Sequence, residues 1–204
     1  MSSKETNDLF LYGASGHGKV VLEIAEILNL PIGGFIDQNP NLRSIYGYPV
    51  LRELPEYGNT FISIGNNLIR KNLAEKINEK RYIRLIHPEC NISKRCEIGV
   101  GSVIMAGATL NTGSQIGSHC IINTNASIDH ECTIRDFVHI SPNVALAGDV
   151  SVGEGTHIGI GACVIQGVRI GKWVTIGAGA VIIRDVPDYA VVVGNPGKVI
   201  KYNK

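Results

Sequence analysis

The sequence predicts two structural parts, a small parallel α/β unit followed by a parallel β-helix built from hexapeptide repeats. The first part is indicated by short apolar strands that alternate with helices up to about residue 88. The second is indicated by sixteen aliphatic residues at strict six-residue spacing from Ile92 to Ile182, each followed four positions later by a small or β-branched residue. A helical period of 3.6 residues cannot produce this spacing. Coils of three short strands produce it, because each side of a coil buries one aliphatic and one small residue.

The repeat also predicts which side chains lie next to one another. Three six-residue sides make one coil, so residues 18 apart share a face about 4.8 Å apart, the ladder spacing of a sheet. By this register His139 and His157 stack, and Gly148 lies beside His130. We expect about five coils.

The C-terminal end of the predicted β-helix is expected to carry a capping segment. The pattern stops after Ile182, at Pro187, and residues 189–204 are expected to form a loop and a short cap. A cap is required because an open terminal coil exposes unpaired backbone groups. The predicted second domain is therefore residues 89–204.

Residues 1–88 show the pattern of a small α/β domain with a Rossmann-like parallel sheet. Residues 1–8 are expected to be an irregular lead-in, and residues 38–59 mostly a loop because they carry three prolines and several glycine or asparagine turns. The expected strands are 9–12, 34–36, 61–64 and 83–86, and the expected helices are about 19–28 and 69–79.

A glycine-rich turn, residues 13–18, joins the first strand to the first helix. Such a turn places free backbone N–H groups at a helix N-terminus, where anions bind. The G-x-x-G-x-G spacing differs from the dinucleotide fingerprint, which argues against NAD. Asp37 and Gly65 end the next two strands at the same sheet edge, where open parallel sheets bind ligands. The pattern favours a nucleotide site, although the glycines could simply make tight turns.

Composition excludes several classes of function. The net charge is +1 without a cluster of Lys or Arg, so nothing indicates a nucleic-acid partner. No apolar stretch approaches the ~20 residues of a membrane span, and the first residues lack the apolar core of a signal peptide, so a cytoplasmic protein is expected. The five cysteines include no C-x-x-C pair, and the register puts Cys96, Cys120 and Cys132 in small inward positions. We interpret these three as core thiols without a metal or redox role.

Four histidines lie in the repeat, none at an inward position, so none is expected to be simply a core residue: His119, His130, His139 and His157. His130 is the best candidate for a general base, because the glycine beside it offers an N–H that a carbonyl oxygen can approach. Asp129 and Glu131 flank it, and a neighbouring carboxylate raises an imidazole pKa and selects its tautomer. The sequence does not distinguish which acid does so, and a solvated surface histidine is the alternative.

The whole chain resembles the left-handed β-helix acyltransferases, and among them the sialic acid O-acetyltransferase and UDP-4-amino-sugar N-acetyltransferase (NeuD/PglD-type) family. The resemblance implies a left-handed parallel β-helix, a homotrimer, and acetyl-CoA bound between the β-helices of neighbouring subunits. It rests on residues 12–18 (YGASGHG), 64–70 (IGNNLIR), 123–124 (NT), 129–132 (DHEC), 136–141 (DFVHIS), 147–148 (AG) and 194–199 (GNPGKV).

Carried onto this sequence, the resemblance implies that His130 is the general base and that Glu131 raises its basicity. The family can carry an acidic pair after the second strand, whereas Gln38 follows Asp37 here, which leaves the nucleotide open. No metal is implied. The residues implied for the acceptor are Ser15, Gly16, His17, Asp37, Gly65 and Asn123, and those implied for acetyl-CoA are His139, Gly148, Ile160, Ala178 and Lys198.

The predicted reaction is direct acetyl transfer from acetyl-CoA to the amino group of a nucleotide-linked amino sugar, such as a UDP-4-amino-4,6-dideoxy sugar. Three alternatives stay open. The first is O-acetylation of a sialic acid or another sugar hydroxyl. The second is a β-helix carbonic anhydrase, which the missing H-x4-H pair disfavours. The third is a trimeric scaffold without catalysis. The sequence does not identify the sugar or the nucleotide.

Overall fold

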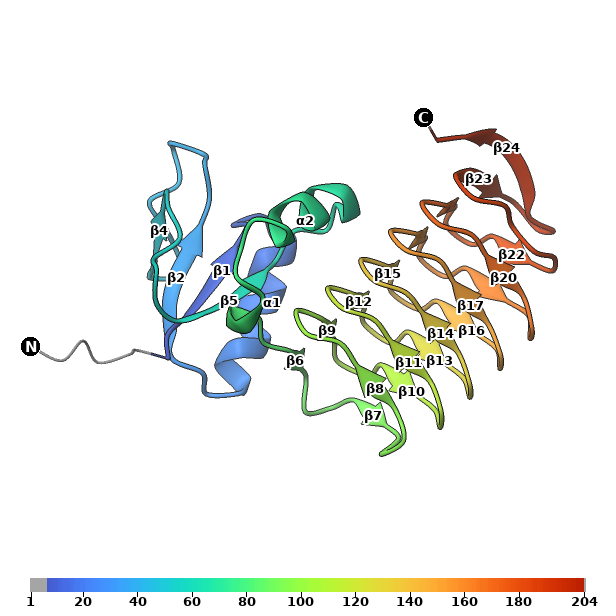
Figure 1. Cartoon of the computed structure of the whole chain (residues 1–204), viewed down its shortest axis with the longest axis horizontal. Coiled ribbons are helices and arrows are strands. Elements are labelled where there is room, and N and C mark those ends of the chain that lie inside the picture. Colours follow the sequence, from blue (N-terminus) through green and yellow to red (C-terminus); the bar gives the residue numbers. More distant parts are fainter. Residues whose placement is uncertain (1–6, 204) are drawn as a thin grey trace, which may run out of the picture.

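The computed structural model describes residues 7–203 and shows both predicted parts (Figure 1). Most of the expected lead-in, and the last residue of the expected cap, lie outside these residues. In the N-terminal part the sheet order is β3-β4-β2-β1-β5, with parallel pairing except between β3 and β4. Its elements are β1 (Leu9–Tyr12), α1 (Gly16–Ile27), β2 (Ile32–Ile36), β3 (Ser44–Ile45), β4 (Tyr48–Leu51), β5 (Asn59–Ile62), α2 (Asn67–Ala74) and the 3-10 turn η1 (Glu79–Arg81).

One expectation for this part was wrong. Residues 38–59 are mostly loop, as expected, although they also contain the hairpin β3–β4, whose four-residue strand β4 extends the sheet. The expected fourth strand does not join this sheet: β6 (Leu85–Ile86) pairs with β9 (Val103–Ile104) in the β-helix. A short apolar run shows that a strand is buried but not which sheet accepts it. The division at residues 88 and 89 stays a proposal, and β6 lies before it.

The second part is a left-handed β-helix whose repeat strands pair in parallel with the strands 18 residues away. The pairing follows the predicted register, as in Ile121↔His139 and His139↔His157. The strands are β7 (Asn91–Ile92), β8 (Glu97–Ile98), β9, β10 (Thr109–Leu110), β11 (Gln115–Ile116), β12 (Ile121–Ile122), β13 (Ser127–Ile128), β14 (Thr133–Ile134), β15 (His139–Ile140), β16 (Ala145–Leu146), β17 (Ser151–Val152), β18 (His157–Ile158), β19 (Cys163–Val164), β20 (Arg169–Ile170), β21 (Thr175–Ile176) and β22 (Val181–Ile182).

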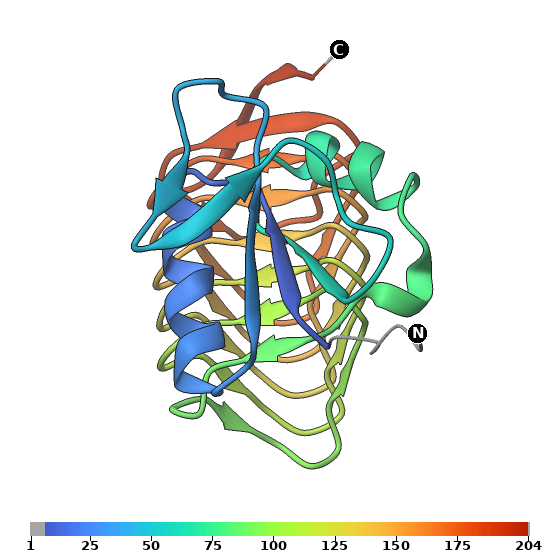
Figure 2. The same ribbon diagram turned by 90° about the vertical axis from the view of Figure 1, so that its left-hand side faces the viewer.

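These strands form three faces, and the N-terminal part covers one of them. The docked face runs β6-β9-β12-β15-β18-β21, the second face β7-β10-β13-β16-β19-β22, and the third face β8-β11-β14-β17-β20. Helix α1 packs between its own sheet and the docked face, so Val21 and Leu22 share a core with Val103 and Ile121. Figure 2 shows the N-terminal sheet and α1 in front of the coils.

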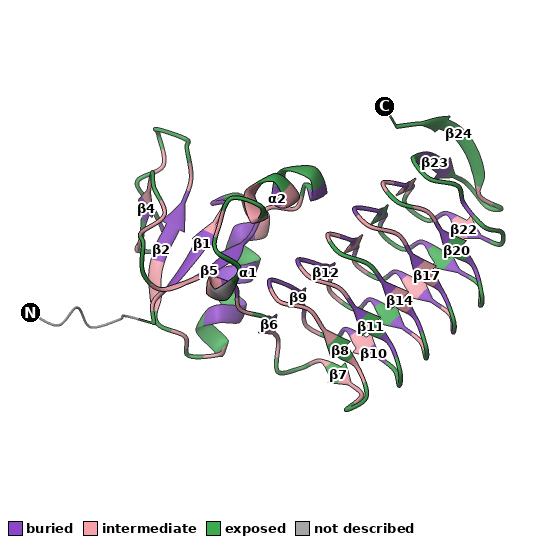
Figure 3. Cartoon of the chain, in the orientation of Figure 1, coloured by how far each residue is buried: buried purple, intermediate pink, exposed green. Residues whose placement is uncertain are grey.

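The interior of the coils is one continuous apolar core (Figure 3). The aliphatic positions fill it, and burying each such side chain is worth roughly 1.5–3 kcal/mol. Cys120 and Cys132 are fully buried and Cys96 packs against the same core, which confirms the interpretation of these three as core thiols.

Most corners of a coil contain one residue in the left-handed backbone region. Glycine, asparagine and aspartate occupy most of these positions, for example Asn125 at φ 55° and Gly107 at φ 70°. A bulky residue there is strained, and such strain is retained where the side chain is needed. The bulky exceptions in the coils are His119, Glu131, Phe137 and Trp173.

The C-terminal segment forms a β-hairpin where a loop and short cap were expected. β23 (Ala190–Val193) pairs in parallel with β21, and β24 (Lys198–Tyr202) pairs antiparallel with β23. The hairpin therefore continues the docked face and satisfies the open backbone groups of its last coil strand. No helix within residues 7–203 is long and apolar enough to cross a bilayer.

Candidate functional site

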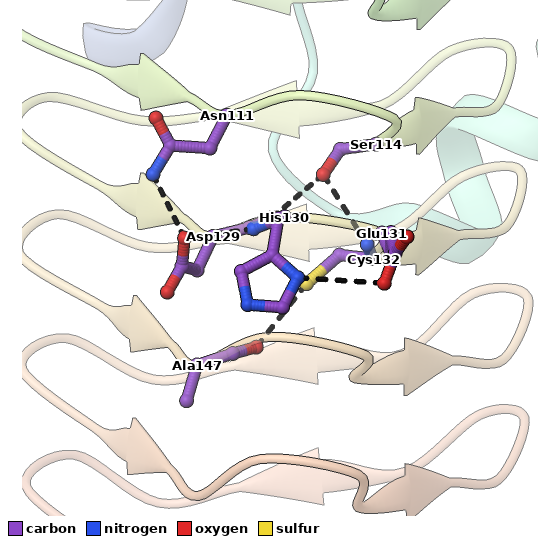
Figure 4. A network of polar contacts seen from close by, with 7 residues as sticks. All are labelled: Asn111, Ser114, Asp129, His130, Glu131, Cys132 and Ala147. Atoms are coloured by element: carbon purple, nitrogen blue, oxygen red, sulfur yellow. Dashed lines mark hydrogen bonds and ion pairs between the residues drawn. The ribbon is translucent and has the colours of Figure 1, made fainter.

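His130 lies at the corner between the second and third faces (Figure 4). Its side chain is 53 % exposed, and its Nδ1 lies 3.5 Å from Oε2 of Glu131. This distance exceeds an ordinary N–H···O bond, but such contacts shorten when substrate binds. A carboxylate beside Nδ1 favours the tautomer with hydrogen on Nδ1, which leaves Nε2 free to accept a proton.

The structure distinguishes the two acids that flank this histidine. Asp129 accepts hydrogen bonds through Oδ1 from the backbone N–H of His130 and from Asn111 Nδ2, each at 2.8 Å. These bonds, that of Asn111 first, lower the pKa of Asp129 and tie its carboxylate to the corner backbone. Glu131 is the acid that faces the ring.

Gly148 lies directly against the imidazole of His130, as the register predicts. A Cβ atom at position 148 would overlap Nε2 and Cε1 of that ring. Within residues 7–203 the Gly148 N–H donates no backbone hydrogen bond. The corner therefore combines an exposed base with an adjacent free donor and no intervening side chain.

The glycine turn before α1 forms the second candidate surface. Gly13 and Gly18 are required by the fold, because Gly13 has φ 112° and a Cβ at Gly18 would overlap the Gly13 carbonyl. Gly16 has an ordinary φ and open space where a Cβ would lie. Ser15 begins the helix without a side-chain capping bond. The turn thus presents free helix N–H groups to an open space.

Asp37 and Gly65 lie at the same sheet edge. Oδ2 of Asp37 accepts from the backbone N–H of Ala14 at 2.9 Å, which ties the glycine turn to the end of β2. Gly65 has open space around its missing Cβ. A cavity of about 530 Å³ beside Gly65, bordered by His157 on the docked face, is of the size that small-molecule sites have.

Three imidazoles connect this edge with the docked face. The rings of His139 and His157 stack with centroids 4.8 Å apart, and the ring of His17 lies 6.4 Å from that of His139. Asn123 Nδ2 lies 3.2 Å from His139 Nε2. His17, Gly65 and Asn123, which were expected on the acceptor side, therefore meet at the junction of the two parts together with His139, which was expected to bind acetyl-CoA.

The junction keeps its histidines neutral. Burial, followed by the charge of Arg70, lowers the pKa of His17 to about 4. Burial, His157 and then Arg70 lower the pKa of His139 to about 3. Nε2 of His17 is buried and has no hydrogen-bond partner among the described residues, so a bound ligand could supply one.

The two candidate surfaces are separate within one chain. Asn123 and His139 lie on or beside the docked face, whereas His130, Glu131 and Gly148 lie at the corner opposite that face. Of the other residues expected to bind acetyl-CoA, Ile160 is 53 % exposed, and Ala178 and Lys198 are exposed as well. No group of three or more His, Cys, Asp or Glu side chains that could hold a metal ion occurs within residues 7–203.

Several junction residues were missed by the sequence analysis. His119 was expected not to be simply a core residue, but it is 6 % exposed, and Tyr82 and Phe137 pack against its ring. Arg70, 1 % exposed, was recognised only as part of a motif. His119 and Phe137 are 18 residues apart and Trp173 follows Phe137 by 36, so the register puts these three bulky residues in one row of corner positions, which was a readable signal.

Comparisons with known proteins cover both parts of the chain. Residues 8–77 match the PglD N-terminal domain model, and residues 149–184 match the bacterial transferase hexapeptide model. UDP-N-acetylbacillosamine N-acetyltransferase from Bacillus subtilis is 49 % identical over 47 residues, which is 22 % of each chain. The chain thus matches about a fifth of that curated relative.

Solved structures match almost the whole chain. The acetyltransferase domain of PglB from Neisseria gonorrhoeae is 39 % identical with a TM-score of 0.90, covering 96 % of this chain and 100 % of that one. A structure of the same domain contains acetyl coenzyme A. PerB from Caulobacter crescentus, in complex with CoA and GDP-perosamine, is 36 % identical with a TM-score of 0.89, covering 95 % of this chain and 97 % of that one. The chain belongs to the hexapeptide-repeat sugar acetyltransferase family of the NeuD/PglD type.

Proposed function

We propose that the protein transfers an acetyl group from acetyl-CoA to the amino group of a nucleotide-linked 4-amino sugar, in the cytoplasm. The observation that carries this proposal is the pairing of an exposed base, His130, with the side-chain-free donor at Gly148. The similar PerB structure, which holds CoA and GDP-perosamine together, supports the substrate class.

The residues at the corner have distinct roles in this proposal. The acceptor nitrogen attacks the thioester carbon of acetyl-CoA, so that an amide C–N bond forms, the C–S bond breaks and CoA leaves as its thiol. Nε2 of His130 takes the proton that the acceptor amine loses, a contribution of about 10²–10⁴-fold. Glu131, whose Oε2 lies 3.5 Å from Nδ1, holds the ring in the tautomer that leaves Nε2 free to accept the proton. The Gly148 N–H donates a hydrogen bond to the acetyl oxygen.

The crevice at the glycine turn holds the nucleotide in this proposal. The open space at Gly16 and Gly65 is not required by the fold, which supports a ligand there. The free N–H groups at the start of α1 suit a diphosphate, and Asp37 suits a ribose hydroxyl. His17 and Asn123 then line the path of the sugar toward the docked face, with His139 beside them.

We further propose that the active unit is a homotrimer. In one chain the crevice and His130 lie on opposite sides of the β-helix, so a sugar held in the crevice must meet the base of another copy. The exposure of His130 and of Ile160 in the single chain fits residues that a neighbouring subunit and acetyl-CoA would cover.

Mixing two impaired variants tests this arrangement. Refolded mixtures of His130→Ala and Asp37→Ala chains are expected to regain activity, because some interfaces combine an intact base with an intact crevice. Random mixing in a closed ring makes about a quarter of the sites complete. Mass measurement must show trimers, and mixtures that stay as inactive as both parents would contradict shared sites.

Variants in the crevice test the nucleotide assignment. Asp37→Ala and Gly16→Val are expected to lower kcat/KM for the nucleotide sugar by at least about 30-fold, because binding energy at the nucleotide orients the reacting amine. Acetyl-CoA affinity, measured by calorimetry, should stay near wild type. Gly47→Ala is a control for substitution at another open glycine, although its φ of 89° adds strain. If these variants lose acetyl-CoA binding but keep normal acceptor affinity, the assignment of the two ligands to the two sites is reversed.

A further inference from the structure

The guanidinium of Arg70 is buried at the junction of the two parts and uses all of its donors. An arginine side chain has five N–H groups, and each donates a hydrogen bond here. Their acceptors are the carbonyls of His119 (2.8 Å), Ile64 (2.8 Å), Gly65 (3.3 Å) and Phe137 (2.9 Å), and Oδ1 of Asn67 (2.9 Å).

No ion pair explains the position of this charge. Within residues 7–203, no carboxylate oxygen lies within 4.0 Å of the Arg70 guanidinium. Burial of a cation is costly, and apolar side chains of similar volume often stabilise a junction as well or better. Stability alone therefore does not explain why a guanidinium without an ion pair is buried at this junction.

The five acceptors fall into two groups that the guanidinium holds together. Ile64 and Gly65 form the loop after β5 at the edge of the crevice. His119 and Phe137 are corner residues that lead into β12 and β15, and β15 begins with His139. One rigid planar group thus sets the crevice loop against two successive coils.

Asn67 extends the same connection to a third coil. Its Oδ1 accepts from Arg70, and its Nδ2 donates to the carbonyls of Gly155 (3.0 Å) and Thr156 (3.2 Å), directly before His157 of β18. Corner residues His119, Phe137 and Gly155 are spaced by one coil each. The network therefore spans the strands whose histidines line the junction.

We propose that Arg70 is a positioning residue for acetyl transfer, whose guanidinium fixes the Ile64–Gly65 loop relative to the strands carrying Asn123 and His139 and so orients the bound acceptor. This inference rests on the proposed function. Gly65 and His157 border the same cavity, so the loop and the docked face already lie next to each other. The charge also helps to keep His17 and His139 neutral.

Arg70→Lys tests this role, because lysine keeps the charge but loses the planar fork. We expect kcat/KM for the acceptor to fall about 10²-fold, the effect of a misplacement of about 1 Å. The KM for acetyl-CoA should change less than about threefold, since that ligand does not contact the crevice loop in the proposed site.

Two other variants serve as controls. Lys71→Met breaks the 2.6 Å ion pair with Glu154, which joins the same two parts without touching the loop. Arg81→Lys removes guanidinium bonds to the carbonyls of Gly58 and Tyr57 inside the N-terminal part. Both are expected to keep the wild-type acceptor kcat/KM.

Hydrogen exchange separates this inference from the proposed function. Amides of residues 63–68 should exchange at least about tenfold faster in Arg70→Lys, at an unchanged global melting temperature. If Arg70→Lys does not fold, Asn67→Ala must show the same exchange change and loss of acceptor kcat/KM. If the wild-type protein acetylates no nucleotide sugar, the proposed function is refuted, but faster exchange of residues 63–68 in Arg70→Lys would still show that Arg70 fixes the loop. Unchanged exchange, acceptor kinetics within about threefold of wild type, or an equal loss of acetyl-CoA binding would overturn the role of Arg70.

Discussion

His130→Ala is expected to lower kcat by at least about 10²-fold, because the acceptor amine then loses its proton acceptor. The side chain is half exposed and packs into no core, so its removal should not disturb folding. Steady-state kinetics at saturating acetyl-CoA and acceptor measure the effect. Thermal melting, mass in solution and acetyl-CoA calorimetry should match the wild type.

The flanking acids provide graded controls for this variant. Glu131→Ala should lower kcat less than His130→Ala does, because the glutamate orients the imidazole but does not itself accept the proton. Asp129→Asn should keep a kcat near that of the wild type, since the asparagine oxygen can still accept the hydrogen bonds from Asn111 and from the backbone N–H of His130. Near-normal turnover of His130→Ala would remove this histidine from the mechanism.

Gly148→Ala should have a comparable effect through a different cause. The new methyl group overlaps the imidazole of His130, so the ring must leave its position or the coil must shift. We expect kcat to fall about 10²-fold, as for other small misplacements of reacting groups. A calorimetric titration with acetyl-CoA and a melting curve show whether the fold is retained.

A double variant tests whether Gly148 acts through His130. If the methyl group acts mainly by displacing the base, His130→Ala/Gly148→Ala should be about as slow as His130→Ala alone. Fully multiplicative losses would instead show that position 148 has an independent role. A Gly148→Ala enzyme with wild-type kcat would contradict the steric account.

Features that depend on the repeat could be predicted from sequence because the register is rigid. The 18-residue step places Gly148 beside His130, stacks His139 on His157 and buries Cys120 without knowledge of any other contact. Each of these positions follows from counting residues, because every coil has the same length and neighbouring strands have the same spacing.

Features that depend on the packing of one part against the other could not be predicted in this way. Four of the five acceptors of Arg70 are backbone carbonyls, which every residue carries, so no side-chain pattern reveals these partners. The strand at Leu85 joined the β-helix because that face offered a free edge. His119 is outward in its own coil, and Tyr82 and Phe137 pack against its ring.

The glycine turn is a second case in which the sequence alone does not distinguish residues with different roles. Gly16 and Gly18 look alike in sequence, but only Gly18 is required by a close backbone contact. The distinction depends on where the Gly13 carbonyl lies in space. It matters functionally, because the open position is the one at which a ligand could lie.

Identification of the acetylated product tests the central proposal most directly. Purified protein would be incubated with acetyl-CoA and, separately, UDP-, GDP- and dTDP-linked 4-amino sugars, free 4-amino sugars and free sialic acid, with products analysed by mass spectrometry and NMR. We predict an amide at the 4-amino nitrogen of a nucleotide-linked sugar, and little turnover of any free sugar. Ester formation on sialic acid, or equal turnover of free and nucleotide-linked sugars, would contradict this account.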